Sequence, residues 1–131
     1  MIKEVFEYFA GQAEAKLGVT CVKGFPDWAR PAAVPPCAAL ELATWASGTP
    51  KRIGQNQARQ EVGLRLYVFA RHEPELASLL DSLADWMLDG EAPVVGSSRL
   101  SVNWREGQRH LNETGTQQEA HGFVVLLTAA W

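Results

Sequence analysis

Residues 61–90 constrain the fold more than any other part of the chain, because their apolar periodicity changes once, at His72. Within residues 62–70, side chains alternate between a strongly apolar face and a mixed face, which is the period of a strand. Within residues 76–87, leucines and other large apolar residues recur every three or four positions, as on one stripe of an amphipathic helix. The sequence therefore predicts a strand that leads almost directly into a helix.

The residues around this change of period also predict how the helix lies. Pro74 suits a first helical turn, and Glu73 and Glu75 complement the positive end of the helix dipole. A joint of one or two residues lets the helix fold back, so that its leucines cover the strand face that carries Val62, Leu64, Leu66 and Val68. Arg65, Tyr67 and Phe69 are then expected to face elsewhere.

The other segments complete an α+β fold. An amphipathic helix is expected from Ile2 to Leu17, ending near Gly18, and strands are expected at residues 19–23, 37–46, 100–104 and 121–131. With the strand at residues 62–70, this gives one domain over residues 1–131. Its architecture is a largely antiparallel sheet of about five strands with two helices packed on one face.

Two connecting segments are open to more than one interpretation. Residues 24–36 are rich in proline, and their aromatic residues Phe25 and Trp28 either cap the edge of the core or contact a partner. Residues 47–58 form a polar linker that carries Lys51 and Arg52, and it is expected to be mobile and basic. This linker is either a solvated turn or a segment that becomes ordered on assembly.

No motif in the chain indicates catalysis or a cofactor. The sequence contains neither GxGxxG nor GxxxxGK[ST], and its three histidines form no recognisable motif. His110 and His121 could meet near Glu119, but such a group on a turn would be a weak metal site. Cys21 and Cys37 are expected to be free thiols in a reducing compartment, without metal-ligand spacing around them. We therefore predict no enzyme activity, cofactor or metal.

The charge distribution is more informative than the total. The net charge of −3 argues against a general nucleic-acid binder, and no apolar run is long enough to predict a membrane span. Residues 51–71 carry five basic side chains against one acidic one, whereas residues 72–98 carry six acidic side chains and no Lys or Arg. Such a two-sided surface can join copies head to tail, and a head-to-tail contact that closes forms a ring. Two independently solvated surfaces would give the same pattern.

The layout of the whole chain resembles that of the tail terminator, or tail completion, proteins of long-tailed bacteriophages. The resemblance is carried by the N-terminal amphipathic helix, the proline-rich stretch PDWARPAAVPP, the strand CAALELATWA and the polar linker. It continues through GLRLYVFAR, which joins directly to the helix ELASLLDSLADWML, and ends with the closing strand FVVLLTAAW. The family has no catalytic signature, so the resemblance supplies no catalytic residues.

This resemblance implies a structural protein of the virion, assembled in the host cytoplasm and located at the head-proximal end of the tail. Copies of the chain would form a ring, expected to be a hexamer, that caps the tail tube, ends tube growth and offers the surface that joins the head. The implied partners are further copies, the tail tube protein and the head–tail connector or neck proteins, with transient, sequence-independent passage of DNA through the ring and no membrane.

The expected subunit or tube contacts are mainly charged. They comprise Lys51, Arg52, Gln55, Asn56, Arg59, Arg65 and Arg71, with Glu73, Asp81 and Asp85 as complements and Trp131 at the apolar C-terminus. Two other functions stay open. One is a different connector, neck or tail component with a similar fold. The other is a small ligand-binding domain or enzyme that uses a cleft between a helix and residues 24–36, with His110 or His121 involved.

Overall fold

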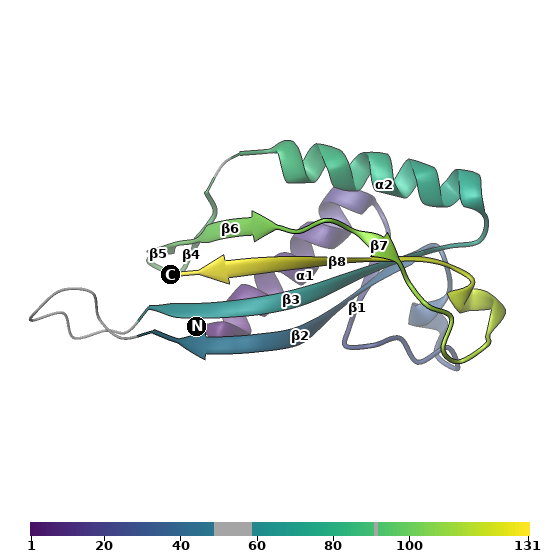
Figure 1. Cartoon of the computed structure of the whole chain (residues 1–131), viewed down its shortest axis with the longest axis horizontal. Coiled ribbons are helices and arrows are strands. Elements are labelled where there is room, and N and C mark those ends of the chain that lie inside the picture. Colours follow the sequence, from purple (N-terminus) through teal and green to yellow (C-terminus); the bar gives the residue numbers. More distant parts are fainter. Residues whose placement is uncertain (49–58, 91) are drawn as a thin grey trace, which may run out of the picture.

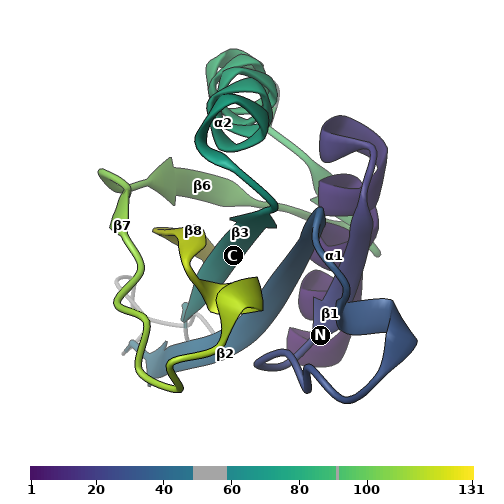
Figure 2. The same ribbon diagram turned by 90° about the vertical axis from the view of Figure 1, so that its right-hand side faces the viewer.

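The structure, a computed structural model, describes residues 1–48, 59–90 and 92–131. Two helices lie on one side of a twisted sheet, and irregular segments lie on the other side (Figures 1 and 2). The elements in chain order are α1 (Ile2–Leu17), β1 (Thr20–Lys23), the 3-10 turn η1 (Pro31–Ala33), β2 (Cys37–Ser47), β3 (Gln60–Ala70), α2 (Glu73–Leu88), β4 (Val94–Val95), β5 (Ser98–Arg99), β6 (Ser101–Trp104), β7 (Gln108–Arg109), the 3-10 turn η2 (Gln117–Glu119) and β8 (His121–Ala130).

Strand β3 lies at the centre of the sheet, as its apolar composition predicts. Over the described residues the strand order is β1-β2-β3-β8-β6, and β7 also pairs with β8. Strand β1 runs parallel to β2, whereas the pairs β2–β3, β3–β8, β6–β8 and β7–β8 are antiparallel. The α+β fold with a largely antiparallel sheet is therefore confirmed, although the sheet has six strands rather than about five.

The main core lies between this sheet and the two helices. From β3, Leu64, Leu66 and Val68 are fully buried, and they belong to the same apolar cluster as residues of α1 and α2. The cluster residues from the helices are Val5, Phe9, Ala10, Ala13 and Leu17 of α1 and Leu76, Leu79 and Leu83 of α2. Both helices thus cover one face of the sheet, as the two periodicities predict.

The ends of the helices show why they begin and stop where they do. Gly18 has the left-handed conformation, with φ of 67°, and its N–H donates to the carbonyl of Glu14 at the end of α1. The side chain of His72 caps α2, because its Nδ1 accepts a hydrogen bond from the backbone N–H of Glu75 at 3.2 Å. His72 is thus a capping residue of α2.

A smaller second core covers part of the opposite face of the sheet. It contains Cys37, Ala39, Tyr67 and Phe69, and the half-buried Trp28 packs against it. The rings of Trp28 and Phe69 meet edge to face, with centroids 4.9 Å apart. Of the two interpretations of the proline-rich segment, core capping therefore describes Trp28, whereas Phe25 remains 41% exposed.

Three short strands were not predicted. Strands β4 and β5 form a separate two-stranded sheet, and β7 lies within the segment expected to be a polar turn. Each has only two residues, so no periodicity can reveal it. The turn between β4 and β5 contains Gly96, whose φ of 62° favours glycine.

Most of the predicted mobile linker, residues 49–58, lies outside the described residues. Its two ends are paired, because the N–H of Gly48 donates to the carbonyl of Arg59 at 2.7 Å. The C-terminal residue lies beside this point: Trp131 is half-buried and exchanges two backbone hydrogen bonds with Gln60, each 3.0 Å long. No helix within the described ranges is long and apolar enough to cross a membrane.

Both cysteines are free, as predicted, and both are buried. Burial raises the pKa of the Cys21 thiol and that of the Cys37 thiol to about 12. Since the thiolate is the reactive form, we expect neither cysteine to react with Ellman's reagent at neutral pH in the folded protein. Both should react once denaturant is added, and fast reaction of one thiol without denaturant would contradict this.

Candidate functional site

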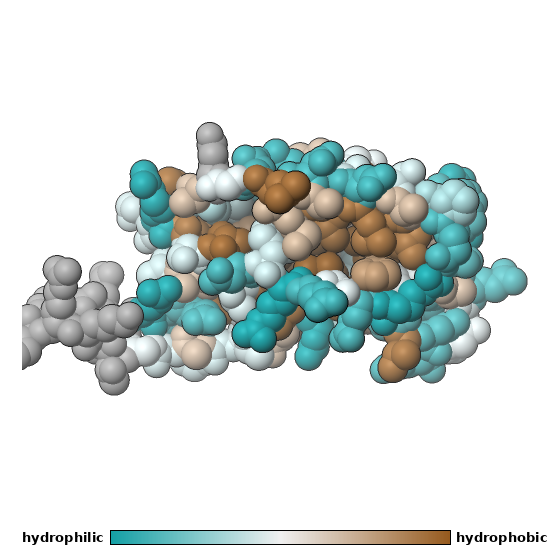
Figure 3. Space-filling view, turned by 45° about the horizontal axis from the view of Figure 1, so that its top comes forward, coloured by the Kyte–Doolittle hydropathy of each residue, from teal (hydrophilic) through white to brown (hydrophobic). Residues whose placement is uncertain are grey.

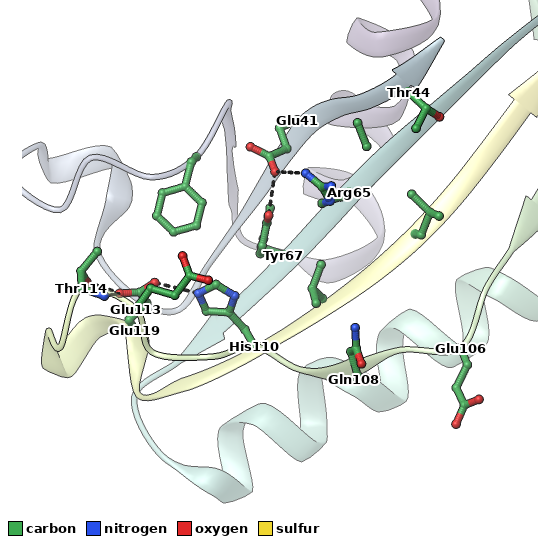
Figure 4. A pocket seen from close by; sticks show the side chains of 14 residues that line it. Glu41, Thr44, Arg65, Tyr67, Glu106, Gln108, His110, Glu113, Thr114 and Glu119 are labelled. Atoms are coloured by element: carbon green, nitrogen blue, oxygen red, sulfur yellow. Dashed lines mark hydrogen bonds and ion pairs between the residues drawn. The ribbon is translucent and has the colours of Figure 1, made fainter. Parts of the chain in front are cut away.

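A cavity of about 700 Å³ opens on the sheet face that the helices leave uncovered (Figure 4). Its floor is formed by β2, β3 and β8, and its walls by Phe25 and by the segment between β6 and β8. The lining residues are Phe25, Glu41, Ala43, Thr44, Arg65, Tyr67, Glu106, Gln108, His110, Glu113, Thr114, Glu119, Val124 and Leu126. This cavity is not the predicted cleft between a helix and residues 24–36, because the helices cover the other face of the sheet.

A carboxylate on β2 organises one part of the cavity. Glu41 is paired with Arg65 across the β2–β3 ladder, so the two side chains lie on the same face. Oε1 of Glu41 accepts hydrogen bonds from Nη1 of Arg65 at 3.1 Å and from the hydroxyl of Tyr67 at 2.6 Å (Figure 4). Burial, followed by the bond to Glu41, raises the pKa of Tyr67 to about 12, so this phenol stays protonated at neutral pH.

A second carboxylate, Glu119, lies fully buried at the other end of the cavity. Its oxygens accept hydrogen bonds from the backbone N–H and the hydroxyl of Thr114, and Nε2 of His110 lies 2.7 Å from Oε1 (Figure 4). Burial alone would raise the pKa of Glu119, but the bonds from Thr114 and His110 outweigh it and hold the pKa below its usual range. Glu119 thus fixes the path of the segment that forms this wall.

The polar groups at this end of the cavity are bonded to one another. The Thr114 hydroxyl donates to the Glu119 carboxylate, and the His110 ring contacts the same carboxylate. The possible group of His110, His121 and Glu119 is present only in part: His110 contacts Glu119, whereas Nδ1 of His121 contacts Oε1 of Glu73 at 2.7 Å. Over the residues that the structure describes, no group of three or more His, Cys, Asp or Glu could hold a metal ion.

Two of the predicted contact residues, Arg71 and Glu73 at the start of α2, are engaged within the subunit. Arg71 forms an ion pair with Glu75 at 2.5 Å, and Glu73 binds both Arg109 and His121. Hydrogen bonds from Arg109 and His121 lower the pKa of Glu73 to about 2. Glu73 and Arg109 are both exposed, so solvent screens the ion pair between them. Glu73 therefore ties the start of α2 to β7 and β8.

The remaining predicted contact residues are distributed around the molecule. Asp81 and Asp85 lie on the exposed side of α2, Arg59 is exposed beside the base of the β2–β3 hairpin, and the side chain of Arg65 is 50% exposed in the cavity. Lys51, Arg52, Gln55 and Asn56 lie outside the described residues. The structure thus brings Arg65 together with Glu41 in the cavity but leaves Asp81 and Asp85 on the helix side of the sheet.

Apolar side chains are also accessible on the helix side of the molecule. Figure 3 shows them gathered between α2 and the neighbouring strands. A groove of about 580 Å³ near the end of α2 is lined by residues of α1, α2 and β6, including Trp86 and Trp104, whose ring centroids lie 4.8 Å apart. This surface and the polar cavity lie on opposite faces of the sheet.

Sequence reasoning did not identify Glu41, Tyr67 or Thr114 as site residues. Glu41 occurs within an otherwise apolar strand segment, CAALELA. A charged residue in such a segment indicates that a neighbouring strand carries an oppositely charged residue beside it. The burial of Glu119 had no signal, because a carboxylate in a polar turn normally faces water.

No protein-family model matches the chain, and no curated protein matches its sequence. Among solved structures, the chain is similar to one chain of the virion of a native gene transfer agent particle. The TM-score is 0.54 with 13% sequence identity, and the match covers 97% of this chain and 90% of that chain. At this identity, the likeness concerns the fold.

Proposed function

We propose that this chain is a structural protein of a phage-like virion and that its copies form a ring, expected to be a hexamer, which caps the tail tube. The observation that carries the proposal is the fold likeness to a virion chain over almost the whole length of both chains. It agrees with the sequence layout that resembles tail terminator proteins. On this proposal the protein lies at the head-proximal end of the tail.

The chemistry of the cavity supports a structural rather than an enzymatic role. Two of its carboxylates are held within the subunit, Glu41 by Arg65 and Tyr67 and Glu119 by Thr114 and His110, and its one histidine contacts a carboxylate rather than a nucleophile. The protein would act by presenting surfaces to further copies, to the tube protein and to connector or neck proteins. DNA would pass through the ring without sequence-specific contact.

Electron microscopy and light scattering of the purified protein, alone and with purified tail tubes, test this proposal. We expect closed rings in solution or at one end of the tubes, and tubes that no longer elongate when the protein is present. A monomer that leaves tube growth unchanged would overturn the proposal. Binding to the head-side connector without binding to tubes would instead support a neck component.

A further inference from the structure

The polar cavity carries a charge opposite to that of another segment of the same chain. Four carboxylates line it, from Glu41, Glu106, Glu113 and Glu119, against the single guanidinium of Arg65. Residues 47–60 contain Lys51, Arg52 and Arg59 and no acidic residue. Charge complementarity of this kind selects partners and their orientation.

We infer that the cavity receives the basic segment of residues 47–60 from a second copy of the chain. This inference rests on the proposed function, because it assigns the contact that would join one copy to the next. The cavity and the segment are different parts of the chain, so the contact is head to tail and can continue from copy to copy until a ring closes.

Two carboxylates that line the cavity have no ion-pair partner among the described residues, although Figure 4 draws that of Glu106 pointing away from the other labelled side chains. Glu41 and Glu119 already hold partners within the subunit. Glu106 and Glu113 are exposed, and within the described part of the chain neither side chain forms an ion pair. Glu113 lies beside His110 on the wall of the cavity (Figure 4).

The aromatic side chains of the cavity suit the same occupant. Phe25 is 41% exposed, and its ring centroid lies 5.4 Å from that of Tyr67 and 5.8 Å from that of His110. Arginine and lysine side chains bind where a carboxylate and an aromatic face lie close together, because both stabilise a positive charge. The cavity is therefore built to take a cationic side chain rather than an anionic or purely apolar one.

At the His110 end of the cavity, chain geometry favours a second copy over the same copy. His110 lies level with Phe69 on the sheet, because its backbone N–H donates to the carbonyl of Gly122, which is paired with Phe69. At roughly 3.3 Å per residue, Phe69 lies about 30 Å along β3 from Gln60 at the base of the hairpin. A connection of the length of residues 48–59 starts and ends at the base of one hairpin, so it can reach at most about 20 Å from that base. Reaching the His110 end of the cavity within one copy would thus require the segment to be stretched back along its own strands.

Charge-swap variants of the full chain test this contact. We expect Lys51→Glu/Arg52→Glu and, separately, Glu106→Lys/Glu113→Lys to weaken self-association at least about tenfold in sedimentation velocity. The combined variant should restore association to within about threefold of the wild type, because it places the opposite charges together again. The substituted residues are either exposed or part of residues 47–60, so we expect all three variants to fold, and circular dichroism checks this.

A binding measurement separates this inference from the proposed function. A synthetic peptide of residues 47–60 is titrated calorimetrically into the wild-type protein and into the Glu106→Lys/Glu113→Lys variant. Binding to the wild type that the variant loses would support the inference even if no ring or tube cap formed. The inference would be overturned if the peptide did not bind the wild type, even if rings form normally. It would also be overturned if the combined variant associated no better than either of the two charge-swap variants it combines.

Discussion

Replacing Phe69 by alanine is expected to lower the free energy of unfolding by about 3–5 kcal/mol, as for other buried aromatic residues. Phe69 is fully buried, and its ring lies edge to face with Trp28, His110 and Phe25 and stacks on Tyr67. It also covers Gly122, where an added Cβ would lie 2.9 Å from the ring. Removing the ring would leave a cavity and release the proline-rich segment.

Urea unfolding followed by circular dichroism measures this loss. Phe25→Ala is the matched control, because Phe25 contacts the same rings but is already 41% exposed. We expect the control to lose much less stability than Phe69→Ala. Equal losses would mean that the second core does not depend on the buried ring, and a loss below about 1 kcal/mol for Phe69→Ala would place that core outside the cooperative unit.

Replacing Glu119 by glutamine is expected to cost about 1.5–3 kcal/mol at neutral pH, because it removes the charge from a buried hydrogen-bond acceptor. The amide has one acceptor oxygen instead of two, so its nitrogen must face either Thr114, whose N–H and hydroxyl both donate to the native carboxylate, or the His110 ring. Glu113→Gln is the matched control, since Glu113 is exposed on the same segment. We expect this control to leave the free energy of unfolding nearly unchanged.

The pH dependence of the Glu119 variant gives a sharper test. The pKa of Glu119 is lower in the folded protein than in the unfolded chain, so the folded state binds fewer protons. The stability from this carboxylate is complete above its unfolded pKa and is lost as the pH falls through its folded pKa. The difference in stability between the wild type and Glu119→Gln should therefore narrow in acid. A constant difference from neutral pH into acid would contradict the role assigned to Glu119.

The parts of the fold that sequence predicts well are those with long periodic patterns. The strand at residues 62–70 and the following helix have enough apolar repeats to fix both the element type and its buried face. The two-residue strands β4, β5 and β7 offer no such pattern. Their positions depend on pairing with other strands, and the local residue pattern carries no information about that pairing.

The cavity could not be assembled from the sequence for a related reason. Glu41 meets Arg65 only because β2 and β3 pair in one register, and that register shifts between Leu42 and Thr44. Glu119 meets His110 only because the intervening turn folds back on itself. Individual residues such as His110 were recognised, but their partners are set by register and turn geometry.

The burial of both cysteines makes the protein well suited to distance measurements between copies. Because Cys21 and Cys37 are shielded inside the fold, one cysteine introduced at an exposed position such as Ser78 would be the only thiol open to a maleimide dye. Energy transfer between dyes on neighbouring copies would then report the number of copies and their spacing without removing a native residue from the core.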